Sequence, residues 1–445
     1  MTRLAPLALA LAACHATVGG DGVDASGPIV DADPAAPDSQ IDAGTGDDRT
    51  VAAEADVPSP KRGVAAQGND YPANLSLTQA DLDVLAPGLT WFYNWGPSTN
   101  LADAHGHLEF VPMAWGHAND NAAVASWLAA HPATSVVFSA NEPNRGDQAN
   151  LSPTDCAAFI EATRAIAGGR PVIGPHLAAS ATVTDYRNQV GAAITGGLSA
   201  GAIHIYETNS GGFDYWASTW PYAGWPTGTA PPATVWIKEL NIGDDNASES
   251  AVIAYMIHAV DLMERDPRVA RYAWWKDRRA FDAGHTKPPS HFLLSNTANG
   301  ALTALGDLYV HMPVHDPHLY YAVPGRLEAE RYVAISDPIV ALQRTADATA
   351  PGALNGDGRL DVAVPTGGWL DYQLDAGTGG AYTVELRSAG DATLAIGGAA
   401  ITTSGNGYAT RAAMVALTPG RQTLRLAVTS GIARVNWLRF TPVAK

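Results

Sequence analysis

Between residues 69 and 310 the chain alternates between short apolar runs and longer alanine-rich stretches, and this alternation most strongly limits the folds open to it. Runs such as Ser135–Ser139 and Thr234–Leu240 resemble buried strands, whereas Ser152–Ala167 and Ser248–Asp266 are amphipathic with helical spacing. Repeated strand–helix units build a parallel sheet. The length suits a compact (β/α)₈ TIM-type barrel, which is the fold class we expect. An open flavodoxin-like α/β sheet is the alternative, although the sequence shows no Gly-rich phosphate loop of that class.

After about Pro317 the pattern changes. Helical stretches give way to short strand-like runs punctuated by Gly, Thr, Asn and Pro, which is typical of an antiparallel β-sandwich of about 120 residues. A chain of 445 residues is also too long for one hydrophobic core. We therefore expect a barrel domain over residues 69–316 and an all-β jelly-roll sandwich over residues 317–445.

The amino terminus predicts export. An apolar run, Ala5–Ala13, follows the basic Arg3 and ends in Leu-Ala-Ala-Cys, the layout of a secretory signal with a lipoprotein box. We expect residues 1–14 to be a lipoprotein signal peptide with Cys14 as the lipidated residue; an ordinary signal peptide with a chance cysteine is the alternative. The run is too short to span a bilayer. A lipid on Cys14 would place an exported protein at the outer membrane or cell surface, unless it is released.

Residues 15–68 predict a disordered acidic linker, because they are rich in Asp, Ala, Gly and Pro and have almost no aromatic residues. The formal net charge of the whole chain is -17, and no Lys/Arg-rich run occurs. Such a surface repels nucleic acid, so that class of partner is not expected. A neutral polysaccharide would be little affected by the charge and remains a possible partner. The protein is expected to be a monomer.

Polar side chains gather where the expected strands end, which is where the reactive groups of a (β/α)₈ barrel are found. Hydrolysis of a glycosidic bond needs one carboxylic acid to protonate the leaving oxygen and a second carboxylate at the anomeric carbon. Glu142 and Glu239 are the candidates for this pair, and Asn141 could hydrogen-bond a sugar 2-hydroxyl. Five polar residues follow three of the runs: Asn141, Glu142, His204, Tyr206 and Glu239.

These residues lie in segments that match a known family in order. Residues 69–310 resemble the family 128 glycoside hydrolases, whose domain is described as an alkali-sensitive-linkage-like catalytic core. The Tyr-Asn-Trp and Val-Pro-Met segments are specific, whereas Asn-Glu-Pro is shared by a whole clan of barrels. The matching segments are Trp91–Pro97, Leu108–Gly116, Asn141–Asn144, Asn150–Pro153, His204–Tyr206, Trp236–Glu239 and Arg271–Trp275.

The resemblance implies a retaining endo-β-1,3-glucanase that needs no cofactor for catalysis, with Glu142 as acid/base and Glu239 as nucleophile. Two residues depart from the family pattern: Asn144 stands where Asp is usual, and Lys238 stands where Thr is usual. Lys238 would help to keep Glu239 ionised if the side chains met, although neighbours along a strand point to opposite faces. The candidate substrate-binding residues of this region are Asn141, His204, Tyr206, Trp115, Trp274 and Tyr93.

Two other readings remain open from the sequence. One is a catalytically inactive, surface-attached glycan-binding lipoprotein, and the other is a hydrolase that acts on a different β-glucan linkage. The separation of the two carboxyl groups bears on the mechanism, because retaining enzymes hold them about 5–5.5 Å apart and inverting enzymes about 6.5–9.5 Å apart.

The carboxy-terminal segment resembles the family 6 carbohydrate-binding modules. The resemblance implies a structural calcium ion, for which Glu328, Glu330 and Asn436 would supply hard oxygen ligands. Trp369 and Tyr408 are the candidates for sugar contact. A solvated pair of acids and a purely structural module are the alternatives. The segments that match are Arg326–Tyr332, Gly367–Tyr372, Gly380–Arg387 and Val435–Phe440.

Overall fold

The computed structural model describes most of the chain beyond the amino-terminal region, within one compact unit that spans residues 41–445. The expected signal peptide, Cys14 and residues 15–46 of the expected linker lie outside the described residues. No helix within the described ranges has the length and apolar character needed to cross a membrane. The described residues are 47–66, 76–101, 106–179, 183–219, 232–279, 286–336, 340–347 and 359–444.

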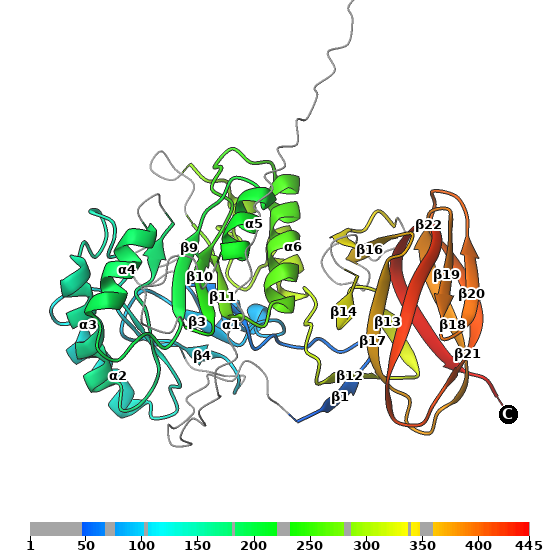
Figure 1. The fold of residues 1–445 in the computed structure, drawn as a ribbon, viewed down its shortest axis with the longest axis horizontal. Helices are drawn as coiled ribbons and strands as arrows, with labels where there is room; N and C mark the ends of the chain where they lie inside the picture. The colour runs from blue at the N-terminus through cyan, green and yellow to red at the C-terminus, as the bar shows by residue number, and fades with distance from the viewer. Residues whose placement is uncertain are drawn as a thin grey trace, which may run out of the picture. The chain divides into compact units, whose positions relative to one another are not determined.

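The α/β core region, residues 62–310, holds two parallel sheets (Figure 1). One has seven strands in the order β4-β3-β2-β11-β10-β9-β8, and the other has three in the order β5-β6-β7. The strands of the first sheet are β2 (Arg62–Ala65), β3 (Trp91–Tyr93), β4 (Glu109–Phe110), β8 (Leu177–Ala178), β9 (Gly201–Ile205), β10 (Val235–Leu240) and β11 (Val269–Trp275). Those of the second are β5 (Met113–Ala114), β6 (Val137–Ser139) and β7 (Val172–Ile173).

Every ladder in these two sheets is parallel, and β11 pairs with β2, so the last strand of the region lies beside the first. The expected mixed α/β core is therefore confirmed. The ladders of the described residues do not join into one closed sheet, because β4 and β5 belong to different sheets, as do β7 and β8. Closure into a (β/α)₈ barrel stays a prediction.

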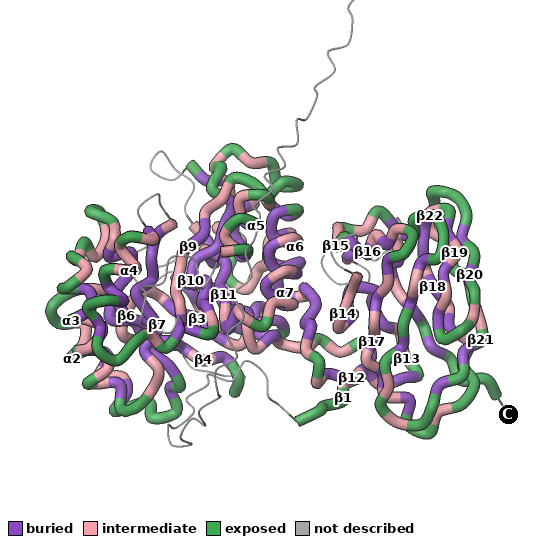
Figure 2. Tube along the Cα trace, in the orientation of Figure 1, coloured by how far each residue is buried: buried purple, intermediate pink, exposed green. Residues whose placement is uncertain are grey.

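Helices separate most of the strands and flank the sheets in Figure 1. Their starts follow local capping chemistry: Thr78 and Asp81 form a capping box, and the hydroxyl of Ser152 accepts a bond from the Asp155 backbone N–H. Figure 2 shows buried residues concentrated along the strands and on the inner sides of helices such as α6. The helices are α1 (Gln79–Leu85), α2 (Asp120–Ala130), α3 (Pro153–Ile166), α4 (Val183–Ala193), α5 (Ser210–Thr219), α6 (Glu249–Arg265), α7 (Ala304–Val310) and the short 3₁₀ turn η1 (Pro289–His291).

The predicted linker is wrong for residues 47–66, which form two strands. β1 (Arg49–Ala52) pairs with β12 (Leu319–Ala322), and β2 lies between β3 and β11 within the first sheet. The sequence pattern concealed β2 because the run is only four residues long and opens on the charged Arg62. The partner that makes this charge tolerable is Glu264, at the end of α6 and far along the chain.

The Arg62 side chain is completely buried and connects several elements of the core region. Its Nη2 lies 2.7 Å from Glu264 Oε1, and its Nε donates to Tyr272 Oη over 3.0 Å. Burial opposes ionisation of Glu264, but the charges of Arg62 and Lys61 bring the pKa of its carboxyl below the usual value. The guanidinium also donates to four backbone carbonyls, those of Tyr309, Val310, Met312 and Pro313.

The carboxy-terminal region is built from strands, as predicted, and its core consists of the side chains that alternate inward along them. The long strand β22 pairs antiparallel with β13, β16, β17, β18 and β19. The jelly-roll topology itself stays a prediction. The strands are β13 (Gly325–Glu328), β14 (Ala334–Ile335), β15 (Ala341–Arg344), β16 (Leu360–Pro365), β17 (Trp369–Asp375), β18 (Gly380–Ala389), β19 (Ala392–Ile396), β20 (Ala399–Thr403), β21 (Ala409–Leu417) and β22 (Arg421–Pro442).

Replacing Arg62 should destabilise the fold, because Arg62→Met leaves the Glu264 carboxylate buried without its cation. We expect a loss of about 3–5 kcal/mol in the free energy of unfolding, measured by urea denaturation. Arg411→Met is the matched control, since Arg411 is an exposed arginine on β21 and should change stability by less than about 0.5 kcal/mol. Equal unfolding midpoints for the two variants would contradict this account.

Candidate active site

Glu142, His204 and Glu239 meet at the carboxyl ends of parallel strands. Each offers one atom to a group in which all the atoms lie within 4.8 Å of one another. His204 Nδ1 is 2.8 Å from Glu142 Oε1 and 3.5 Å from Glu239 Oε2. All three side chains are buried. The structure therefore brings together the two glutamates that the sequence analysis selected.

The backbone that presents Glu142 is strained. Ala140 and Glu142 have φ angles of 57° and 41°, in a region that residues other than glycine rarely adopt. Two hydrogen bonds hold this turn, from Glu142 N to His176 O and from His176 N to Ala140 O. Asn144 fixes the following loop, because its amide both donates to and accepts from the backbone of Ala178. An ionised Asp, usual in the family at this position, could not donate. Such strain is commonly found at functional sites.

Glu239 lies in β10 and is surrounded by donors. Tyr206 Oη donates to its Oε2 over 2.6 Å, and Trp95 Nε1 donates to its Oε1 over 2.8 Å. Burial would raise the pKa of Glu239, but the electrostatic effects of the nearby His204 and Lys238 side chains outweigh that effect. With the two hydrogen bonds, they lower its pKa to about 2. Glu239 is therefore ionised at neutral pH.

Glu142 has different surroundings. Its Oε1 faces His204, and its Oε2 lies 3.7 Å from Nε of Arg145, a half-exposed side chain. Tyr206 and Trp95 each donate a short hydrogen bond to Glu239, whereas the short hydrogen bond at Glu142 is the one that it shares with His204. Two carboxyl groups in unequal environments are what acid and nucleophile roles require of such a pair.

Lys238 does not point away from Glu239, as strict strand alternation would require. In the pairing of β10 with β9, Ile237 lies opposite Ile203 and Glu239 lies opposite His204, so Lys238 is an extra residue. This β-bulge breaks the alternation. Lys238 Nζ consequently lies 3.4 Å from Glu239 Oε1.

The same ammonium group holds Asn141, a predicted substrate-binding residue. Lys238 Nζ donates to Asn141 Oδ1 over 2.5 Å, and Asn141 Nδ2 donates to Gln148 Oε1 over 3.2 Å. Asn141 lies at the strand end beside Glu142 and is almost fully buried.

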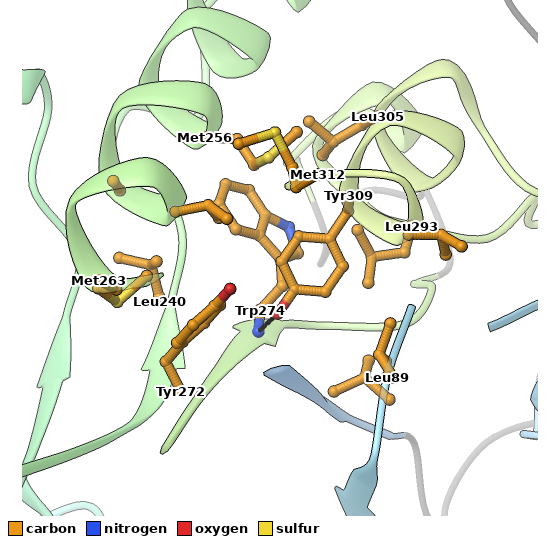
Figure 3. Close-up of a cluster of buried hydrophobic side chains, with 14 of the residues drawn as sticks. Leu89, Leu240, Met256, Met263, Tyr272, Trp274, Leu293, Leu305, Tyr309 and Met312 are labelled. Atoms are coloured by element: carbon orange, nitrogen blue, oxygen red, sulfur yellow. Dashed lines mark hydrogen bonds between the residues drawn. The ribbon is translucent and has the colours of Figure 1, made fainter. Parts of the chain in front are cut away.

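The prediction that Trp274 binds substrate is wrong, because its side chain is completely buried. Its ring has no exposed surface and belongs to the hydrophobic cluster drawn in Figure 3, where it lies among Tyr309, Leu293 and Met312. Its Nε1 donates to the backbone of His291 over 3.0 Å. A ring enclosed in this way cannot stack on a substrate.

Trp275, the next residue of β11, faces the opposite side of the sheet from Trp274, because successive side chains of a strand alternate. Trp275 is therefore the better candidate for stacking on a substrate. Trp275 is partly exposed and packs edge-on against Tyr206, with ring centroids 5.6 Å apart. Trp275, Trp95 and Trp115 all pack against the inner cluster of the core region while keeping exposed surface. Trp115, predicted to bind substrate, stacks on His117 with ring centroids 4.6 Å apart.

Tyr93 and His204, predicted to bind substrate, are fully buried. Tyr93 Oη donates to the Lys238 carbonyl over 3.2 Å and lies 3.4 Å from Glu239 Oε1. His204 contacts both glutamates. These two side chains therefore position the carboxyl groups of the glutamates. Their burial does not place them in direct contact with a substrate.

The sugar-contact candidates of the carboxy-terminal region are both engaged by arginines. The Arg425 guanidinium lies 3.9 Å from the ring centroid of Trp369 and covers one of its faces. Tyr408 hydrogen-bonds Asp361 and has Arg434 5.6 Å from its ring centroid. A role for Trp369 and Tyr408 in sugar binding stays a prediction.

The predicted calcium ligands are buried. Burial and the nearby charge of Glu328 raise the pKa of Glu330 well above its usual value, and within the described residues Glu330 Oε2 has no hydrogen-bond partner. Glu328 Oε1 pairs with Arg326 Nε at 2.9 Å, and Asn436 Nδ2 donates to Thr345 Oγ1 over 2.9 Å. Two adjacent buried carboxyl groups with an unsatisfied oxygen fit a hard cation such as Ca²⁺.

A family model described as glycosyl hydrolase catalytic core matches residues 72–309, more than half of the chain. The chain belongs to the glycosyl hydrolase catalytic core family. It is therefore a glycoside hydrolase, and its two adjacent glutamates lie within the matched segment. A search of curated proteins finds no match.

Solved structures similar to this glycoside hydrolase are family 128 enzymes. An endo-β-1,3-glucanase of subgroup II from Sorangium cellulosum is 26% identical, with a TM-score of 0.48, over 57% of this chain and 99% of that one. The corresponding values for a subgroup II endo-β-1,3-glucanase from Pseudomonas viridiflava are 26%, 0.46, 58% and 100%. A curdlan-specific exo-β-1,3-glucanase of subgroup III from Blastomyces gilchristii, in complex with glucose, gives 23%, 0.44, 56% and 97%.

The two adjacent tryptophans of β11 should respond differently to truncation. Trp275→Ala removes a partly exposed ring beside Tyr206 and should raise the KM for the polysaccharide substrate by up to about tenfold with little change in stability. Trp274→Ala empties part of the core and should cost about 3–5 kcal/mol of stability. Steady-state kinetics and thermal unfolding of both variants test this. An unchanged KM in Trp275→Ala would contradict the assignment.

Proposed function

We propose that this glycoside hydrolase is a retaining endo-β-1,3-glucanase, with Glu142 as acid/base and Glu239 as nucleophile. The observation that carries the proposal is the approach of one oxygen from each carboxyl group to within 4.8 Å. Retaining enzymes hold the two carboxyl groups about 5–5.5 Å apart, and inverting enzymes hold them about 6.5–9.5 Å apart to admit a water molecule. The short distance supports the retaining mechanism.

In the first step, Glu239 attacks the anomeric carbon while Glu142 transfers its proton to the departing glycosidic oxygen. The products are a glycosyl ester on Glu239 and a shortened chain with a free hydroxyl. The donors around Glu239 favour its carboxylate form before the attack. Its preference for the ionised state is what a nucleophile needs.

In the second step, Glu142, now a carboxylate, removes a proton from water. The resulting hydroxide attacks the anomeric carbon and the ester bond to Glu239 breaks, which restores both carboxyl groups and the original anomeric configuration. Because Glu142 gives its proton to the leaving oxygen and takes one from water, and Glu239 forms and releases the ester, the reaction needs no cofactor.

The β-1,3 linkage is proposed from the resemblance of segments Trp91–Pro97 and Leu108–Gly116 to family 128 enzymes. The pairing of β11 with β2 supports the closed (β/α)₈ barrel that a resemblance to family 128 implies. A different β-glucan linkage is the alternative, and comparison of laminarin, curdlan, pustulan and lichenan as substrates distinguishes them. Cleavage of pustulan or lichenan without cleavage of laminarin and curdlan would rule out the β-1,3 assignment.

Both amide variants should lose activity on laminarin. We expect Glu142→Gln to reduce kcat by about 10²–10⁴-fold, because general acid–base assistance is lost, and Glu239→Gln to reduce it at least as much. With an aryl glycoside that has a good leaving group, Glu142→Gln should recover its first step, since no proton is required there. Glu239→Gln should not recover.

Two controls complete this experiment. Glu249→Gln changes an exposed glutamate at the start of α6 and should keep full activity. Proton NMR of the first products of wild-type hydrolysis should show the β-anomer. An initial α-anomer would exclude the retaining mechanism, and full activity in either amide variant would exclude the assignment of the pair.

For the carboxy-terminal region we propose a carbohydrate-binding module with a structural Ca²⁺ held by Glu328, Glu330 and Asn436. The raised pKa of Glu330 supports this, because a cation would relieve the repulsion between the two buried carboxyl groups. Millimolar Ca²⁺ should raise the unfolding temperature of the wild-type protein relative to EGTA. Glu330→Gln should abolish that difference. No difference in the wild type would refute the calcium site.

A further inference from the structure

We infer that Lys238 is a positioning residue for hydrolysis: its buried ammonium group fixes the side-chain amide of Asn141 and holds the Glu239 carboxylate in place. The inference rests on the proposed function of the Glu142–Glu239 pair and adds a third charged residue to it. Within the matched segments, Lys238 is one of the places where the sequence departs from the family pattern, which usually has Thr there.

The bulge in β10 is the structural basis of this role. With regular alternation along β10, a residue next to Glu239 would face the opposite side of the sheet. The extra residue between Ile237 and Glu239 turns Lys238 toward the same space as its neighbour. Lys238 Nζ thereby reaches both Asn141 Oδ1, at 2.5 Å, and Glu239 Oε1, at 3.4 Å.

An ammonium group orients an amide unambiguously. It carries three donors and no acceptor, so only the oxygen of the Asn141 amide can face it. The Nδ2 group must then point the other way, as its bond to Gln148 Oε1 indicates. A donor is thereby available at the strand end that carries Glu142. A Thr hydroxyl could accept as well as donate and would leave the amide free to turn over.

The charge itself is costly to keep at this position. Lys238 is completely buried, and its Nζ is 4.7 Å from the ring centroid of Tyr93 and 3.5 Å from Met113 Sδ. Removing an ammonium group from water is unfavourable unless nearby opposite charges compensate. Here the compensation comes chiefly from the Glu239 carboxylate, whose Oε1 lies 3.4 Å from Lys238 Nζ. The charge is thus tied to the glutamate proposed as the nucleophile.

Titration of Lys238 should consequently be visible in the activity. Burial lowers its pKa to about 8, against the opposing effect of Glu239 and Glu142. Tyr93 and His176 are two further ionisable groups close to Lys238, and His204 lies on the other side of Glu239, 3.5 Å from its Oε2. Burial raises the pKa of Tyr93 well above 10, and burial together with the charge of Lys238 lowers the pKa of His176 well below its usual value. Neither changes its charge between about pH 7 and 9, so neither accounts for a loss of activity in this range, and a loss that the Lys238 variants abolish is assigned to Lys238.

The decisive variants are Lys238→Met, which keeps the length without the charge, and Lys238→Thr, which restores the residue usual in the family. Both should lower kcat on laminarin by about ten- to a hundredfold, with KM changed less than about threefold. The acid limb of kcat/KM should move to higher pH, because Glu239 loses a positive neighbour and its pKa rises. The alkaline decline near pH 8 should disappear.

Lys287→Met is the matched control, because Lys287 is another buried lysine, bonded to Ile242 O and paired with Asp245. Its pH profile should equal that of the wild type. If wild-type protein hydrolyses laminarin, and both Lys238 variants keep the wild-type kcat and pH limbs while folded, the inference is overturned and the proposed function stands.

A spectroscopic measurement keeps the test independent of activity. The chain has five lysines, so the side-chain ¹³Cε signals of a lysine-labelled sample can be assigned with Lys238→Met. The Lys238 signal should titrate near pH 8 in the wild type and at lower pH in Glu239→Gln, where a compensating carboxylate is lost. A Lys238 midpoint that Glu239→Gln leaves unchanged would overturn the inference. Failure of the wild type on every β-glucan would instead refute the proposed function.

Discussion

Two buried carboxyl groups with oxygens within 4.8 Å of each other repel one another when both are ionised, and the rest of the site is organised around this repulsion. Donors and cations are distributed unequally over the pair. Glu239 receives short hydrogen bonds from Tyr206 and Trp95, and Glu142 shares His204 with it. The surroundings of Glu239 therefore favour its ionised form, and the unequal environments of the two carboxyl groups are the chemical basis of the proposed hydrolysis.

The parallel sheets are what make such a site possible. Glu142, His204 and Glu239 come from distant parts of the chain, and the carboxyl ends of parallel strands bring them to one edge. Holding a buried polar cluster there requires a rigid frame, because an unsatisfied member is costly. The Arg62–Glu264 pair is part of that frame, since it ties β2 to α6 and to the segment after α7. The site and its support thus use the same device, a buried charge with a fixed partner.

Part of this arrangement was predictable from the sequence. Polar and ionisable residues at the carboxyl ends of strands must share one edge of a parallel sheet. Glu142 and Glu239 were predicted on this basis. Trp274 was chosen wrongly because strand alternation requires knowing which residue faces inward, and an error of one position exchanges the faces. Lys238 was expected to face away because a bulge leaves no mark in the local pattern.

The other errors also have long-range causes. Strand β2 was taken for linker because the residue that makes Arg62 acceptable, Glu264, is invisible to any local reading of the sequence. No local pattern separates Trp95 from a core tryptophan, and its hydrogen bond to Glu239 shows that it belongs to the site. Periodicity therefore predicts strands and their ends, whereas side-chain partners from other strands decide which residues do chemistry.

The central claim is that Glu239 attacks the anomeric carbon and that Glu142 acts as the general acid and then as the general base. The most direct measurement uses an activated 2-deoxy-2-fluoro-laminaribioside, which slows breakdown of a glycosyl ester, followed by peptide mass mapping of the labelled protein. The account predicts one sugar adduct on the peptide that carries Glu239, absent in Glu239→Gln. An adduct on Glu142 would contradict it. So would the absence of an adduct on both glutamates in a protein that hydrolyses the glucan rapidly.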